Sequence, residues 1–184
     1  MWWGFAFSNA MNIDADDFTL LGLKRAFALD RSQLDAAWKA LQAQVHPDRF
    51  AAEGGTAQRL AMQWAVRVNE AHQRLKDPLK RAAYLCELGG APVQAHSNTA
   101  MPGACLMQQM EWREALEDAD SAPDVQALSD EVLAQRKARL ARVTQLLDVD
   151  AQPAQAALEV RALMFIDRLL EEIDARLERY EDAS

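Results

Sequence analysis

Three consecutive residues, His46, Pro47 and Asp48, bring together side chains of contrasting chemistry at one point of the chain. Pro47 lacks a backbone N–H and has a fixed φ, so it ends a preceding helix and stiffens the loop. An imidazole at a helix C-terminus lies beside unsatisfied carbonyl groups, which favour its cationic form. The carboxylate of Asp48 can accept two hydrogen bonds from an arginine of a partner. The tripeptide is therefore suited to contact with another protein.

Acid–base catalysis is the other chemistry that a histidine near an aspartate suggests. The sequence places no nucleophile and no Gly-rich phosphate loop near the pair, so we do not expect the chain to be an enzyme. A simple helix-ending turn is the plainer alternative, because a specified tripeptide occurs by chance in about one chain in fifty of this length. Nearby cations are expected to form a positive rim for an acidic partner surface: Arg49, Lys39, Arg31 and Arg25.

The segments on either side of the tripeptide have the apolar spacing of amphipathic helices. Before it, a helix capped at Asp30 carries Leu34, Trp38, Leu41 and Val45. After it, a polar loop leads to a helix that opens near Thr56 and carries Leu60, Trp64, Val68, Ala71 and Leu75. Short helices are expected at 14–23 and from Asp77-Pro78 to Gly89-Gly90. We therefore expect an antiparallel helical pair with short flanking helices.

The second half predicts three more helices, at about 104–120, 121–147 and from Pro153 onward. Ser121 and Asp124 fit a capping box, and the short connections imply antiparallel neighbours in a three-helix bundle. The fold prediction is all-α, with a first domain at 11–90, a turn-rich linker at 91–103 and a bundle at 104–184. Residues 1–10 are aromatic but lack the basic region of a signal peptide, and we interpret them as an N-terminal extension or a tag remnant.

Composition excludes several classes of partner. The formal net charge is −8, so binding to nucleic acid or to an anionic membrane surface is not expected. Residues 101–184 account for it, with 9 basic against 18 acidic side chains. No apolar run reaches the roughly 20 residues that span a bilayer. Cys86 and Cys105 lack metal-site spacing, so we expect buried thiols of a cytosolic protein.

The predicted helix that begins near Ala104 has two contrasting faces, given about 100° of rotation per residue. One face is a core face, with Cys105, Trp112, Leu116 and Ala119. The opposite face carries Leu106, Met107, Met110, Glu111, Glu114 and Asp118. A solvated face should not gather a leucine and two methionines, so this face predicts a docking surface. Phe165 of the last helix is expected to join it. The alternative is that the first domain packs over these residues.

Two motifs of the first half resemble the J-domain family: the His-Pro-Asp tripeptide between two helices, and Lys80-Arg81-Ala82-Ala83-Tyr84 after the second helix. Segments of the second half extend the resemblance to the HscB family, the J-proteins of iron–sulfur cluster assembly. These segments are Thr99–Met101, Leu106–Glu111, Arg113-Glu114 and Phe165–Leu169. The resemblance runs from about Asp16 to Leu177. It implies a J-domain at 11–90 and a client-binding bundle at 104–184.

The resemblance also implies two partners. His46, Pro47 and Asp48, with Arg49 and Lys39 beside them, would contact an HscA-type heat-shock ATPase and stimulate its ATP hydrolysis. The second site would bind an IscU-type scaffold, on which the iron–sulfur cluster is built, through Leu106, Met107, Met110, Glu111, Glu114, Asp118 and Phe165. The cluster would be cargo of the scaffold, so we expect no cofactor and no metal site in this chain.

The chain departs from the family pattern at a few positions. Arg49 replaces the commoner lysine, Cys105 stands where a bulky apolar residue is usual, and Asp118 is shorter than the expected glutamate. The tetra-cysteine motif of some eukaryotic members is absent, which favours a bacterial, cytoplasmic protein. Two other functions stay open: a general J-protein co-chaperone for unfolded clients, and a helical adaptor in which the tripeptide is incidental.

Overall fold

The computed structural model describes residues 12–93 and 103–182, and every regular element in these ranges is a helix. The all-α prediction is confirmed. The chain forms two compact units that divide between Arg81 and Ala82. The predicted boundaries of the domains stay predictions, because most of the 91–103 linker and all of residues 1–10 lie outside the described residues. Within the described ranges, no helix is both long enough and apolar enough to span a membrane.

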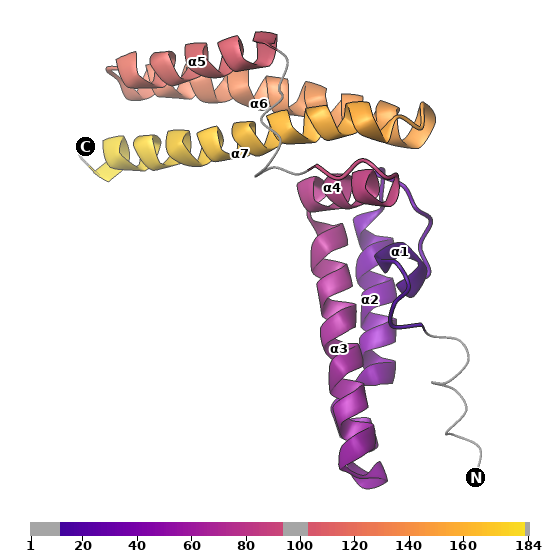
Figure 1. Cartoon of the computed structure of the whole chain (residues 1–184). Helices are drawn as coiled ribbons and strands as arrows, with labels where there is room; N and C mark the ends of the chain where they lie inside the picture. Colours follow the sequence, from indigo (N-terminus) through magenta and orange to yellow (C-terminus); the bar gives the residue numbers. More distant parts are fainter. Residues whose placement is uncertain (1–11, 94–102, 183–184) are drawn as a thin grey trace. The chain divides into compact units, whose positions relative to one another are not determined.

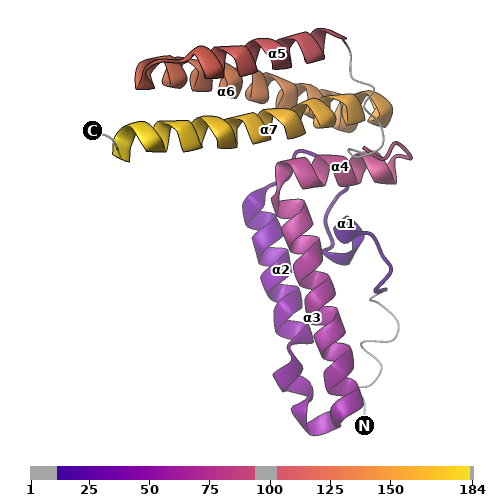
Figure 2. The same ribbon diagram turned by 60° about the vertical axis from the view of Figure 1, so that its left-hand side comes forward.

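The first unit is built on two antiparallel helices, α2 (Arg31–Val45) and α3 (Gly55–Lys76), which lie side by side in Figures 1 and 2. Asp30 caps α2 as predicted, since its carboxylate accepts from the backbone N of Ser32 at 2.7 Å. The predicted apolar positions Leu34, Val45, Trp64, Val68, Ala71 and Leu75 are buried. The hydrophobic pattern thus identified most of the buried residues of these two helices.

Leu60 is the exception on α3, because its side chain is 46% exposed while the neighbouring Ala61 is buried. Ala61, Val68 and Leu75 recur every seven residues and, with Trp64 and Ala71, form the buried face of α3. Leu60 lies at the edge of that face. The prediction that Leu60 belongs to the core was therefore wrong by one position.

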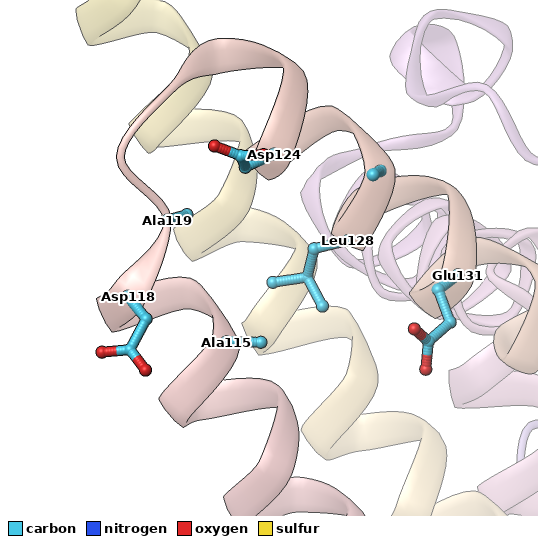
Figure 3. Close-up of a pocket in the computed structure, with 7 residues that line it drawn as sticks. Ala115, Asp118, Ala119, Asp124, Leu128 and Glu131 are labelled. Atoms are coloured by element: carbon cyan, nitrogen blue, oxygen red, sulfur yellow. The ribbon is translucent and has the colours of Figure 1, made fainter.

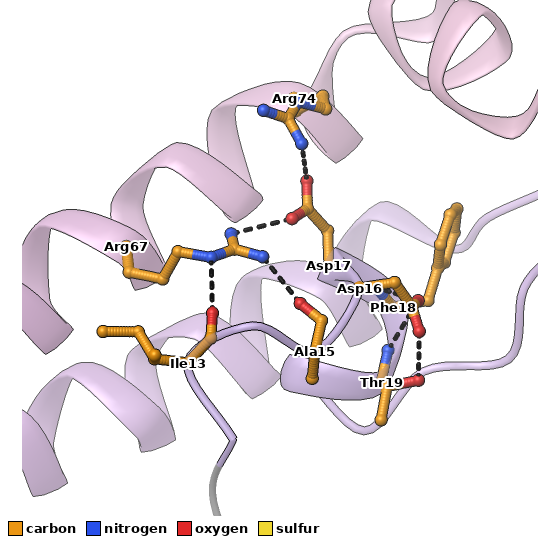
Figure 4. A network of polar contacts seen from close by, with 8 residues as sticks. All are labelled: Ile13, Ala15, Asp16, Asp17, Phe18, Thr19, Arg67 and Arg74. Atoms are coloured by element: carbon orange, nitrogen blue, oxygen red, sulfur yellow. Dashed lines mark hydrogen bonds and ion pairs between the residues drawn. The ribbon is translucent and has the colours of Figure 1, made fainter. Parts of the chain in front are cut away.

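A buried carboxylate attaches α1 (Asp17–Leu20) to α3, as Figure 4 shows. Asp17 is fully buried and pairs with Arg67 at 2.7 Å and with Arg74 at 3.0 Å. Arg67 also donates to the backbone carbonyls of Ile13 at 3.2 Å and Ala15 at 2.8 Å. Two arginines of one helix therefore hold the segment that precedes α2.

Helix α4 (Pro78–Leu88) begins and ends where the sequence predicts. The Asp77 carboxylate accepts from the backbone N of Leu79 at 2.8 Å. At the other end, the N–H of Ala91 donates to the carbonyl of Cys86, and Gly90 has a φ of +77°, which favours glycine. Cys86 is buried as expected, and burial raises the pKa of its thiol to about 11.

The second unit contains a three-helix bundle of α5 (Gly103–Asp118), α6 (Ala122–Thr144) and α7 (Pro153–Asp182). Ser121 caps α6 as predicted. The helix predicted to run to about residue 147 ends at Thr144, and a π-helical turn follows it, η2 (Gln145–Val149). The bundle core contains Trp112, Val125, Val132, Ile166, Leu169 and Ile173. The predicted bundle is therefore present, and Leu169 belongs to its buried core.

Candidate functional site

The loop between α2 and α3 follows from the proline. Because the residue before a proline is disfavoured in the α region, α2 ends at Val45, and His46 has a φ of −61° and a ψ of 127°. Pro47 then begins a 3₁₀ helix, η1 (Pro47–Glu53), where a polar loop was expected. The backbone N of Arg49 donates to the carbonyl of His46 at 3.1 Å. The tripeptide is thus held between two helical segments.

The side chains of His46 and Asp48 face solvent, with exposed fractions of 56% and 88%. The Nδ1 atom of His46 accepts from the backbone N of Asp48 at 3.4 Å and lies 3.6 Å from the Asp48 Oδ2 atom. A neutral Nδ1 makes the first contact, whereas a protonated one makes an ion pair with the carboxylate. In either state, the Asp48 carboxylate is accessible to a cation of a partner.

The four cations of the predicted rim do not gather around the loop. Arg31 begins α2, about 22 Å from His46 at 1.5 Å per residue, and it pairs with Asp35 at 3.3 Å. Arg25, which precedes α2, pairs with Asp16 at 2.6 Å. Lys39 is exposed roughly two turns before the loop. Arg49 is exposed, but its Nη1 donates to the carbonyl of Ala43 at 2.9 Å. Only Lys39 and Arg49 of this set lie near the tripeptide.

The predicted docking side of α5 is exposed in the structure. Leu106, Met107 and Met110 are 46%, 64% and 70% exposed, and Glu111, Glu114 and Asp118 are exposed as well. The predicted core residues Trp112 and Ala119 are buried on the opposite side, while Cys105 and Leu116 are half-buried. The helical geometry therefore separated the two faces of α5 correctly. We refer to the six exposed residues together with Phe165 as the docking face.

One edge of the docking face borders α6. Asp118 lines a shallow pocket with Ala115 of α5, with Ala119 directly after α5, and with α6 residues that include Leu128 and Glu131, as Figure 3 shows. The Glu131 carboxylate accepts from the indole Nε1 of Trp112 at 2.8 Å. The acidic part of the docking face thus continues onto a second helix.

The other edge borders α7 and contains Phe165. Its side chain is half-buried and packs against the bundle core, so it is less exposed than the sequence suggested. Arg113 of α5 lies over the Phe165 ring, with its Cζ atom 5.5 Å from the ring centroid. The site prediction did not include Arg113. Its spacing of three residues from Met110 and seven from Leu106 was the available signal.

Comparison with known proteins now decides the family. Residues 101–174, which include α5 and α6, match the family model described as the HSCB C-terminal oligomerisation domain. A co-chaperone protein HscB homolog of Burkholderia thailandensis is 55% identical over 167 residues, which cover 89% of this chain and 95% of that protein. The chain belongs to the HscB co-chaperone family.

Solved HscB structures share the fold. Chaperone HscB from Vibrio cholerae is 35% identical and superposes with a TM-score of 0.76, covering 90% of this chain and 99% of its own. Human co-chaperone protein HscB is 26% identical with a TM-score of 0.83, covering 91% of this chain and 84% of its own. The chain therefore has the fold of HscB co-chaperones, a J-domain followed by a C-terminal helical domain, and the family's process is iron–sulfur cluster assembly.

Proposed function

We propose that this co-chaperone binds an IscU-type iron–sulfur scaffold through the docking face and presents it to an HscA-type ATPase. The His46-Pro47-Asp48 loop would stimulate ATP hydrolysis by that partner. The exposure of Leu106, Met107 and Met110 carries the proposal, because these side chains lie on a helix whose opposite face already fills the bundle core. Three adjacent exposed apolar side chains are costly to keep in water unless another surface covers them.

The charge around these side chains indicates the kind of partner. Glu111, Glu114 and Asp118 flank the apolar residues on α5, and residues 101–184 carry a net charge of −9 from 9 basic and 18 acidic residues. An apolar centre with a charged rim is the usual anatomy of a specific protein interface. The partner's matching surface should therefore combine an apolar patch with lysines or arginines.

The loop supports the second contact. Asp48 presents an accessible carboxylate from a short 3₁₀ segment, and Pro47 restricts the backbone beside it. A carboxylate held in this way suits a bidentate arginine of the ATPase. Lys39 and Arg49 add positive charge near it for acidic groups of the same partner.

Together, the two contacts would let this chain deliver the scaffold to the ATPase. A chain that holds the scaffold at one site and the ATPase at the other raises the effective concentration of one for the other. The iron–sulfur cluster is cargo of the scaffold in this scheme. Within residues 12–93 and 103–182, no group of three or more histidine, cysteine or acidic side chains could hold a metal ion. The bacterial relatives suit a cytoplasmic setting for this delivery.

Scaffold binding is tested with a triple substitution, Leu106→Ala/Met107→Ala/Phe165→Ala. We expect the affinity for purified scaffold, measured by calorimetry, to fall about a hundredfold or more, because truncating a central apolar anchor typically costs about 2 kcal/mol. A matched control is Leu133→Ala/Val149→Ala, which removes apolar side chains that are 48% and 68% exposed elsewhere in the same unit. Unchanged affinity of the triple variant would refute the site assignment.

Stimulation of the ATPase is tested separately with His46→Gln and Asp48→Asn in single-turnover ATP hydrolysis. We expect Asp48→Asn to lower the stimulation about tenfold or more, since a hydrogen bond to a charged group contributes about 1.5–3 kcal/mol. Glu70→Gln, an exposed acidic position on α3, is the control. If both loop variants stimulate normally, the loop is not the activator and the adaptor interpretation is favoured.

A general co-chaperone for unfolded clients is the competing function, because exposed leucine and methionine side chains also suit extended apolar segments. The two functions differ in what competes for the docking face. A permanently unfolded polypeptide should not displace the folded scaffold if the proposal holds. Displacement at comparable concentrations would favour the general function.

A further inference from the structure

We propose that Arg113 is a positioning residue of the docking face: its guanidinium holds the ring of Phe165 at the edge of α5, so that the ring is in place before the scaffold binds. The inference deepens the proposed function and depends on it, since it concerns how the same scaffold surface is assembled. Scaffold recognition would then require Arg113 as well, although Arg113 would not be the main contact with the scaffold.

The position of Arg113 on α5 is the first observation. It follows Met110 by three residues and Leu106 by seven, so all three lie along one edge of the helix. The helical rotation from Leu106 to Met110 and Arg113 stays within about 60°. This edge is the one that borders α7, because the Arg113 guanidinium contacts two residues of that helix.

The contacts of the guanidinium are the second observation. Its Cζ atom lies 5.5 Å from the centroid of the Phe165 ring, within the range of a cation–π interaction. Its Nη2 atom lies 3.4 Å from the Oε1 atom of Glu172, two turns further along α7. The planar guanidinium can therefore contact the ring while its N–H groups point to a carboxylate.

The burial of Phe165 explains why such a contact matters. The ring packs against the bundle core, where it lines a small gap with Cys105 and Trp112. It remains half-buried, which leaves a surface that a partner can reach. Arg113 adds a cationic contact from α5 to this ring and joins it to the edge of α5 that carries Leu106 and Met110.

A direct contact between Arg113 and an acidic group of the scaffold is the competing explanation, because Arg113 is 53% exposed. A double-mutant cycle separates the two. Positioning requires Phe165, so the effect of Arg113→Ala should disappear once Phe165 is replaced. A direct contact requires no ring, so its effect should persist.

The experiment measures the affinity of the full chain for apo scaffold by calorimetry, with Arg113→Ala, Phe165→Ala and the double variant. We expect Arg113→Ala to weaken binding about two- to fivefold, as fits the loss of one partly exposed cation–π contact. The double variant should bind as Phe165→Ala does. Arg113→Lys, which keeps the charge, should restore part of the loss. Arg142→Ala, an exposed arginine of α6, is the control and should have no effect.

A second measurement needs no scaffold. The ring protons of Phe165, followed by NMR in the free protein, should shift when Arg113 is replaced by alanine and not when Arg142 is. An unchanged ring signal would overturn the inference, as would an equal loss of affinity in the presence and absence of Phe165. If Phe165→Ala and the Leu106/Met107/Phe165 triple variant bind scaffold normally, the proposed function itself fails, whatever the ring signal does.

Discussion

The His46-Pro47-Asp48 loop and the docking face are constructed in opposite ways. The loop is contiguous, and a single proline sets its backbone between two helical segments. The docking face takes residues from α5 and α7 that lie as much as 59 residues apart, which is the separation of Leu106 and Phe165. A local backbone rule defines the first site, whereas the packing of a bundle defines the second. A single substitution should therefore impair the function of the loop strongly, whereas binding at the docking face should weaken step by step as more of its residues are replaced.

The two sites also differ in what keeps them in place. The loop depends on the packing of α1, α2 and α3, in which the fully buried carboxylate of Asp17 forms ion pairs with two arginines. The docking face depends on a helix that is anchored on one side by Trp112 and exposed on the other. Substitutions at the exposed side should change binding with little change in stability. Substitutions in the buried network should do the reverse.

The largest expected effect is on the frame of the loop. Asp17→Asn removes the charge that Arg67 and Arg74 share, and breaking a buried pair by removing one partner typically costs about 3–5 kcal/mol. We expect a loss of unfolding free energy of about 3 kcal/mol in urea denaturation. Asp14→Asn, an exposed neighbour, is the control. A loss below about 1 kcal/mol would show that the network is not what holds the frame.

Charge on the docking face should act more weakly and mainly on association. Glu111→Gln/Glu114→Gln/Asp118→Asn removes three exposed negative charges from α5. We expect the association rate with scaffold to fall about tenfold at low salt, because charge complementarity steers encounter. The difference should nearly vanish at about 1 M salt, where the Debye length is about 3 Å. Stopped-flow measurements at both salt concentrations would show this, and an effect confined to dissociation would contradict it.

Arg49 has two possible roles, which one substitution distinguishes. Its guanidinium donates to the carbonyl of Ala43 near the end of α2, so Arg49→Ala should lower the unfolding free energy by about 1 kcal/mol. If Arg49 also contacts the ATPase, the stimulation should fall severalfold at a temperature where the variant is fully folded. A stability change without a change in stimulation would assign Arg49 to the loop's frame alone. Lys39→Ala, which lacks a comparable link to the loop, provides the comparison.

The smallest expected effect is a pH dependence of the first unit. Burial alone would raise the pKa of Asp16, but hydrogen bonds from Arg25 and Thr19 hold it well below the ordinary value of 3.8. The stability that this carboxylate contributes is therefore present above pH 3.8 and is lost as the pH falls below it. Asp16→Asn should make the unfolding free energy less dependent on pH between about pH 4 and 2. Denaturation at several pH values tests this, and parallel curves would contradict it.

Much of the fold follows from local rules that can be applied to a sequence. Asp30 and Ser121 predicted helix starts because their side chains can satisfy backbone N–H groups, and both do so. Pro47 predicted the end of α2 for the same kind of local reason. The assignment of Leu60 to the core failed because an apolar side chain at the edge of a helical face fits the pattern on either side of the boundary.

The candidate sites divide in the same way. The tripeptide was identified from three consecutive residues between two predicted helices. The exposed side of α5 was identified from the helical rotation of about 100° per residue. The sequence did not show that Arg31 and Arg25 pair with neighbouring carboxylates far from the loop, because ion pairs depend on side-chain positions. It also did not show that Arg113 meets Phe165.

By itself, the sequence determined the all-α class, the helix boundaries near capping residues and prolines, and which residues of α5 lie on opposite sides. These follow from interactions within a few residues along the chain. The tertiary structure decided which edge of α5 borders α6 and which borders α7, and hence that Arg113 lies over the ring of Phe165. Helical periodicity states which residues share a face, but only the packing of three helices determines what each face meets.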